Sequence, residues 1–164
     1  MVAFALVAAL TAFADTPLPP NIAVSADLTR IVSEALRASP TLRQQSERIG
    51  RMRRVRVQIE LHPPEEPSPL VMGRAYTNIR RYQFGLIIAA VRLISTHSAA
   101  ALLAHELEHV SEYADGIDYW AASVRTPHAV WKTGRNTFET ARAVFVERAV
   151  EREVRLSQAR HLDR

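Results

Sequence analysis

The stretch Ala101-Leu102-Leu103-Ala104-His105-Glu106-Leu107-Glu108-His109-Val110 decides how the rest of the chain is interpreted. It carries the pattern H-E-x-x-H inside an alanine- and leucine-rich run, which predicts one helix from about Ser98 to Asp115 with Thr96 or Ser98 as its N-cap. Two histidines four residues apart lie on one face of a helix, so both imidazoles can reach one metal ion. Glu106 would then face water at that metal, as the general base of a zinc hydrolase.

A plainer interpretation of this helix is two solvated or hydrogen-bonded histidines on an amphipathic surface. H-E-x-x-H is a short pattern, and Leu103, Leu107 and Val110 give the helix an ordinary buried face. His105 and His109 project away from that face. We favour a metal site because the pattern falls inside a strongly predicted helix.

A hydrolytic zinc site usually takes three protein ligands, so a third ligand is expected after the two histidines. A last helix is predicted over about Thr137 to His161, and Glu139 falls near the middle of its apolar arc. An unpaired charge there would be costly, and a zinc ion would supply its partner. Glu147, at the margin of the arc, is the alternative ligand. Asn136 and Glu139 also have the spacing of a capping box, which would give Glu139 a structural role instead.

Two further polar residues are expected near the site without binding the metal. Glu112 lies one turn beyond His109 on the same side of the helix, and we expect it to be solvated or to support a ligand by hydrogen bonding. Arg142 points into the apolar arc of the last helix, and we expect it to pair with a buried carboxylate.

The remaining chain predicts an α+β domain. Helical spacing of apolar residues covers 23–50, with a break at Ser39-Pro40. Alternation predicts a strand at Val55–Leu61, and two more strands are expected, at about Val71–Asn78 and within Tyr82–Ile94. Residues 116–135 are predicted to be mostly loop.

The amino-acid composition excludes several classes of function. The chain has 164 residues, a formal net charge of +4 and no cysteine, which excludes thiol catalysis, thiolate ligands and disulfides. Arg51, Arg53, Arg54 and Arg56 form the densest basic group, but strand-like apolar residues interrupt them. We therefore expect a solvated basic surface and no nucleic-acid partner.

The N-terminus predicts export. Residues Val2–Ala14 are almost wholly apolar, and Ala12-Phe13-Ala14 fits a signal-peptidase site. We expect residues 1–14 to be a signal peptide cleaved after Ala14, and residues 15–164 to be a single secreted or periplasmic domain. The apolar run is too short for a membrane-spanning helix, and the mature chain is expected to contain none.

The pentapeptide His105–His109, taken with Phe138-Glu139-Thr140, resembles the gluzincin clan of zinc metallopeptidases, and in particular its compact members called minigluzincins. The resemblance covers the chain from Val55 to the end of the last helix. It implies a zincin-like fold, with a small mixed sheet followed by the H-E-x-x-H helix and a C-terminal helix that bears the ligand glutamate. It also implies an edge strand that binds substrate in extended form, a role we expect for the strand within Tyr82–Ile94.

The activity implied by this resemblance is zinc-dependent hydrolysis of a peptide or protein substrate. Zn²⁺ would be held by His105, His109 and Glu139, with Glu106 as general base toward metal-activated water. The alternative function is a catalytically weak or inactive zinc-binding factor of the cell envelope with the same fold. A third alternative is a metal-free helical scaffold.

The sequence departs from the family pattern at Ala143. Thermolysin-like members carry an aspartate four residues after the ligand glutamate, where it orients the first histidine. Because Ala143 cannot do this, Glu112, Glu147 or a backbone carbonyl is expected to hold His105. The candidates for the substrate-stabilising group are Tyr113, Tyr119 and His128.

Overall fold

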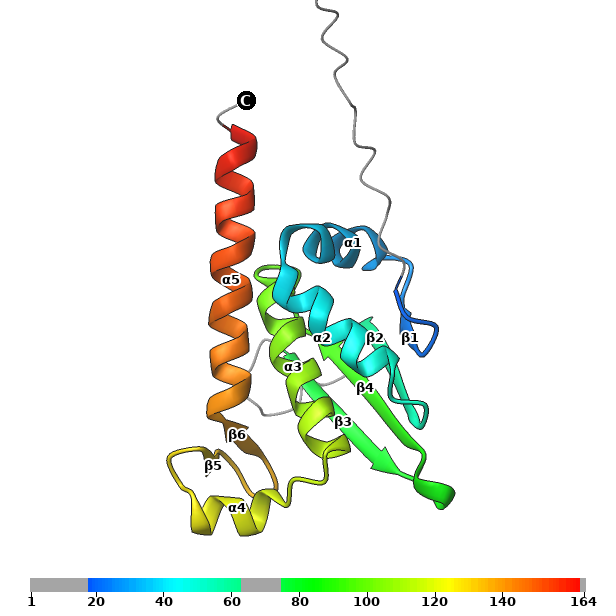
Figure 1. The fold of residues 1–164 in the computed structure, drawn as a ribbon, viewed down its shortest axis with the longest axis vertical. Helices are drawn as coiled ribbons and strands as arrows, with labels where there is room; N and C mark the ends of the chain where they lie inside the picture. Colours follow the sequence, from blue (N-terminus) through cyan, green and yellow to red (C-terminus); the bar gives the residue numbers. More distant parts are fainter. Residues whose placement is uncertain (1–17, 63–74, 163–164) are drawn as a thin grey trace, which may run out of the picture.

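The computed structural model describes residues 18–62 and 75–162, which form an α+β arrangement (Figure 1). Its strands are β1 (Ile22–Val24), β2 (Val55–Leu61), β3 (Ala75–Arg81), β4 (Ile87–Leu93), β5 (Val130–Lys132) and β6 (Phe138–Thr140). Its helices are α1 (Thr29–Ala38), α2 (Pro40–Gly50), α3 (Ala99–Ala114), α4 (Tyr119–Arg125) and α5 (Ala141–Leu162), with a short 3-10 turn, η1 (Gln83–Gly85). Among the helices of these two ranges, none is long and apolar enough to cross a membrane.

Four strands form one mixed sheet in the order β1-β2-β4-β3. β1, β2 and β4 run parallel, and β3 runs antiparallel to β4. The alternation predicted for β2 is confirmed, because its buried side chains are Val55, Val57 and Ile59. The predicted signal peptide, residues 1–14, lies outside the described residues, as do residues 71–74 of the predicted second strand.

The expectation that the strand within Tyr82–Ile94 forms the edge of the sheet is wrong. β4 pairs with β2 along one side and with β3 along the other, so both of its edges are hydrogen-bonded. Its alternate residues Ile87, Ala89, Val91 and Leu93 are all buried, as suits an internal strand. The edge strand beside α3 is β3, whose outer edge pairs with no other described strand.

The helical prediction for residues 23–50 holds from Thr29 onward. Its start is wrong, because Ile22–Val24 pairs with β2 as strand β1. The break at Ser39-Pro40 is confirmed. Pro40 is the first residue of α2, and Ser39 Oγ caps that helix by accepting a hydrogen bond from Leu42 N at 3.0 Å.

Helix α3 lies against the sheet, with α5 beside it (Figure 1). Its predicted apolar face is buried, and Leu103, Leu107 and Val110 belong to the main core. Ser98 occupies the N-cap position, but its side chain makes no capping hydrogen bond. The Ser98 backbone instead adopts φ 58, and Ala99 N donates to Thr96 O at 3.3 Å. Packing on the sheet, rather than a side-chain cap, stabilises this helix.

The C-terminal part differs from the sequence prediction at two places. Residues 116–135, predicted as mostly loop, contain α4 and β5. The last helix begins at Ala141 rather than Thr137, because residues 138–140 are held extended by antiparallel pairing with β5. Thr140 Oγ1 accepts a hydrogen bond from Ala143 N at 3.1 Å, so Thr140 caps this helix, and the helix start leaves no place for the alternative capping box of Asn136 and Glu139.

Candidate metal centre

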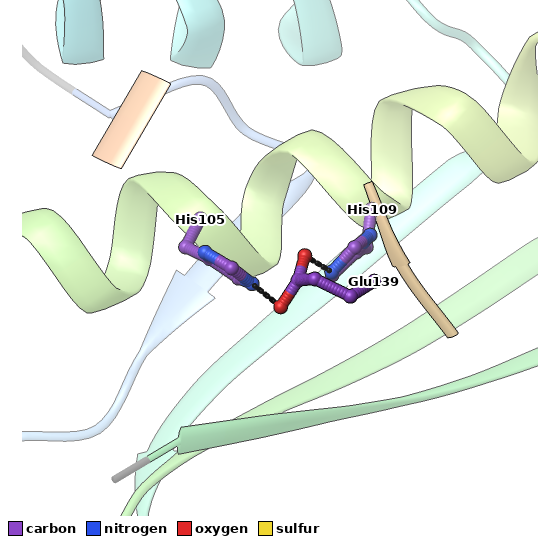
Figure 2. Close-up of side chains that lie close together, drawn as sticks. All are labelled: His105, His109 and Glu139. Carbon is purple, nitrogen blue, oxygen red and sulfur yellow. Dashed lines mark ion pairs between the residues drawn. The ribbon is translucent and has the colours of Figure 1, made fainter. Parts of the chain in front are cut away.

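Three side chains from two elements converge beside α3 (Figure 2). His105 Nε2 lies 3.2 Å from Glu139 Oε2, and His109 Nε2 lies 3.5 Å from Glu139 Oε1. The ligand atoms of these three residues all lie within 4.8 Å of one another, and no other group of this kind is found in residues 18–62 and 75–162. The structure thus brings together the three residues predicted as ligands, and the group could hold a metal ion.

Glu139 reaches the histidines from strand β6, not from the last helix. The expectation of a ligand on a C-terminal helix is therefore wrong, although the residue is the same. Trp131 in β5 lies opposite Glu139 in the pair register, and this pairing fixes the extended backbone at that point. Glu139 Oε1 also accepts a hydrogen bond from Thr140 N at 2.7 Å, which holds the carboxylate just before α5 begins.

The other nitrogen of each imidazole is held by a second carboxylate. His105 Nδ1 lies 2.8 Å from Glu147 Oε2, and His109 Nδ1 lies 3.1 Å from Glu112 Oε2. An ionised carboxylate only accepts hydrogen bonds, so each Nδ1 carries the proton and each Nε2 faces Glu139. Glu147, the alternative ligand, thus contacts the far side of His105, one of the roles expected for it, while Glu112 supports His109.

The pKa values of the three side chains shift in opposite directions, upward for the two histidines and downward for Glu139. Burial disfavours a charged ring, but the hydrogen bonds to Glu112 and Glu139 outweigh it and raise the pKa of His109 to about 10. Burial also lowers the pKa of His105, but the hydrogen bond and the negative charge of Glu139 outweigh it, so the pKa of His105 is raised as well. Against the effect of burial, the two rings lower the pKa of Glu139 to about 2. The centre therefore stabilises positive charge between the three side chains, supplied by protons or by a metal ion.

The donor set suits a divalent ion that keeps an open coordination position. Two imidazole nitrogens and one carboxylate are the ligands of many hydrolytic zinc sites. The supporting carboxylates fix the ring orientations in the way that ligand histidines in such sites require. These contacts are observations of this chain, and they fit a metal ion independently of any family resemblance.

Glu106 is buried and lines a cavity together with the two histidines and Glu139, and Thr77 holds it from the edge strand. Thr77 Oγ1 donates a hydrogen bond to Glu106 Oε2 at 2.6 Å. Burial raises the pKa of Glu106, against the opposing hydrogen bond from Thr77. The sequence carries no signal for Thr77, because no local pattern places β3 beside α3.

A buried ionic cluster supports α3 behind the histidines. Glu108 and Glu112 are both buried, and Arg142 pairs with Glu108 and lies 3.8 Å from Glu112. Gln45 donates a further hydrogen bond to Glu108 at 2.9 Å. The expected pairing of Arg142 with a buried carboxylate is confirmed. Because Arg142 lies three residues after Glu139, the same contacts dock the segment that carries Glu139 on α3.

The three candidates for a substrate-stabilising group occupy different places. Tyr119 lines the cavity of about 360 Å³ that contains His105, Glu106 and Glu139. Its hydroxyl donates toward His109 O at 3.2 Å and Glu112 Oε2 at 3.3 Å. Tyr113 is not among the residues that line this cavity, and His128 is exposed on the connection before β5. Of the three, only Tyr119 lies where it could meet a substrate.

Comparison with known proteins gives no assignment: no protein-family model, no curated protein and no solved structure matches the chain.

Proposed function

We propose that the protein is a zinc-dependent metallopeptidase with a zincin-like fold of the gluzincin type. The observation that carries this proposal is that each imidazole, of His105 and of His109, lies between two carboxylates. Both Nε2 atoms face Glu139, and both Nδ1 atoms are held by further carboxylates. A plain structural role for two helix histidines requires no such convergence.

A zinc ion bound there would act as a Lewis acid, polarising a substrate carbonyl and making water more acidic. His105, His109 and Glu139 would hold the ion, and Glu147 and Glu112 would fix the two rings. Glu106 would accept a proton at Oε1 and later return it to the leaving amine, while Thr77 keeps Oε2 in place. Burial favours the protonated carboxyl of Glu106, which suits a group that must carry a proton during the reaction.

The outer edge of β3, which pairs with no other strand of the described residues, supports a peptide substrate. Ala75, Tyr76, Thr77 and Ile79 of this strand line the same cavity as the histidines. An extended peptide can pair with a free strand edge through its backbone groups. Such pairing would bring a peptide carbonyl to the centre without selecting particular side chains.

The substitution Glu106→Gln tests the function. The metal-loaded variant should retain about one zinc per chain and lose at least about a hundredfold in peptide cleavage, because a general base is removed without a ligand. Glu151→Gln, at an exposed position on α5, serves as the matched control and should keep both properties.

Two outcomes would contradict the proposal in different ways. Zinc bound by the parent with no cleavage of any peptide library would favour a zinc-binding envelope factor without turnover. No zinc in the parent, even after zinc is offered at neutral pH, would favour a metal-free scaffold.

A further inference from the structure

A second feature of the molecule lies at the end of the sheet, away from the metal centre. The connection from α2 to β2 and the connection from β3 to β4 lie together at the lower right of Figure 1. We use the name sheet tip for the exposed residues Arg51, Arg53, Arg54, Arg80, Tyr82 and Phe84. None of them takes part in the metal centre.

The sheet register brings these segments together. Val55 at the start of β2 lies opposite Ile87 at the start of β4, and Arg81 at the end of β3 lies opposite the same residue. Ile87 N donates to Arg54 O at 2.7 Å. The Arg54 guanidinium lies so close to Gly85 that a side-chain carbon at this glycine would be 3.3 Å from it. Arg54 therefore lies beside the turn that carries Phe84.

Phe84 protrudes from this turn. The residue is 89% exposed, the largest value among the exposed large hydrophobic residues of the described chain. Its backbone has φ 59, a left-handed conformation that bulky residues rarely adopt. Glycine or asparagine would fit this conformation at lower cost, so the chain holds an aromatic ring in solvent at a strained position. Such an outlier points to a role for the exposed ring.

The charge of the tip is of one sign. The sequence contains no aspartate or glutamate in residues 51–56 or 80–88. Ile88, 40% exposed, lies between Arg56 and Arg80 across the register of the three strands. Apolar side chains thus alternate with arginines, and the tip presents both a positive field and exposed apolar surface.

We propose that the sheet tip docks on the surface of an anionic phospholipid bilayer. Arginines would contact lipid phosphates, while Phe84 and Tyr82 would enter the interfacial region, where aromatic rings are favoured. The high exposure of Phe84 indicates a protrusion rather than a groove, and a protrusion can contact a planar surface. Single-stranded nucleic acid is usually bound in a groove that follows its backbone, so it is the less suitable partner.

A basic face of α5 is the competing surface within the same chain. Phe145 is 71% exposed there, and Arg148 and Arg152 lie nearby on the helix. Glu147 and Glu151 are interspersed with these arginines, unlike in the sheet tip. α5 therefore provides a matched control with the same residue types at a different place.

The test measures binding of the full chain to phosphatidylcholine vesicles with and without phosphatidylglycerol. Replacing Arg51, Arg53 and Arg80 by glutamine should weaken binding to anionic vesicles roughly a hundredfold, since each arginine near such a surface contributes about fivefold. Phe84→Ala should weaken it by about tenfold. The apolar run Val2–Ala14 is common to all variants, and vesicles without phosphatidylglycerol measure its contribution.

The control variants are Phe145→Ala and the double substitution Arg148→Gln with Arg152→Gln, which should leave vesicle binding unchanged. Added salt should weaken binding of the parent, because the arginines act through a screened field. The proposal is overturned if anionic lipid does not increase binding, or if only the α5 variants lose it. It is also overturned if the tip arginines bind a single-stranded oligonucleotide in preference to the vesicles. Zinc need not be present, so the result is independent of the proposed peptidase activity.

Discussion

Glu147 Oε2 lies 2.8 Å from Nδ1 of His105, while Nε2 of the same ring faces Glu139 Oε2 at 3.2 Å. Two carboxylates therefore hold opposite edges of one imidazole. The sequence left open whether Glu139 or Glu147 is the third ligand, and this arrangement separates their roles. Glu139 contacts both histidines, whereas Glu147 contacts only His105.

Glu139→Gln and Glu147→Gln should therefore differ in zinc affinity. The first removes the charged carboxylate that faces both histidines and that we propose as the third metal ligand, and it should abolish stoichiometric binding. The second removes a supporting contact, and it should weaken affinity by about tenfold to a hundredfold. Competition with a chromogenic chelator measures both, with Glu151→Gln as the control. If Glu147→Gln abolished binding and Glu139→Gln kept it, Glu147 would be the ligand and Glu139 the supporting residue.

Thr77 offers a test of how Glu106 is positioned. Thr77→Val keeps the shape of the side chain but removes the hydroxyl that donates to Glu106 Oε2. We expect kcat to fall by about tenfold with KM little changed, because the contact orients a proton-transferring group rather than the substrate. Thr77→Ser should restore kcat. Steady-state kinetics on a cleaved peptide measure this, and a valine variant with unchanged kcat would show that the contact is dispensable.

Arg142 should matter to stability more than other arginines of α5. Its removal leaves the buried carboxylates Glu108 and Glu112 without their cation. Because the Arg142 side chain is itself 46% exposed, we expect Arg142→Met to lower the free energy of unfolding by about 1–3 kcal/mol, below the cost of breaking a fully buried pair. Arg148→Met should change it by less than about 0.5 kcal/mol. Urea unfolding of the two variants would refute this if their midpoints were equal.

The hydrogen bonds of Glu153 lead us to expect that the stability of the fold depends on pH. It accepts hydrogen bonds from Ser39 Oγ at 2.5 Å, Thr41 N at 3.1 Å and Thr41 Oγ1 at 2.7 Å, and thereby ties α5 to the start of α2. Burial raises the pKa of Glu153, but these hydrogen bonds outweigh it and lower the pKa below its ordinary value of 4.5. A depressed folded-state pKa contributes stability that is present above the unfolded-state value and is lost as pH falls through the folded-state value.

The parent should accordingly be more stable than Glu153→Gln above about pH 4.5, and this advantage should shrink as the pH falls further. Unfolding by urea at a series of pH values measures the difference. Glu151→Gln is the control on the same helix, since Glu151 is exposed. An advantage that did not change with pH would mean that the contact does not depend on ionisation.

The sequence by itself determined the elements whose signal is local. The spacing of His105 and His109 on a run rich in alanine and leucine predicted α3, and alternation predicted β2. Ser39-Pro40 predicted the start of α2, because a proline is favoured at the first turn of a helix. The apolar arc of the predicted last helix indicates Glu139, but this reason does not apply, because Glu139 lies in strand β6.

Only the tertiary structure decided the features that depend on pairing between distant segments. The strands β1, β5 and β6 are three residues each, and so short a segment is extended only because a partner strand holds it. The same holds for the edge position of β3 and for the contact of Thr77 with Glu106. Local periodicity carries no information on which strand lies outermost or which carboxylate contacts which ring nitrogen. Those choices follow from the packing of α3 against the sheet and of α5 against α3.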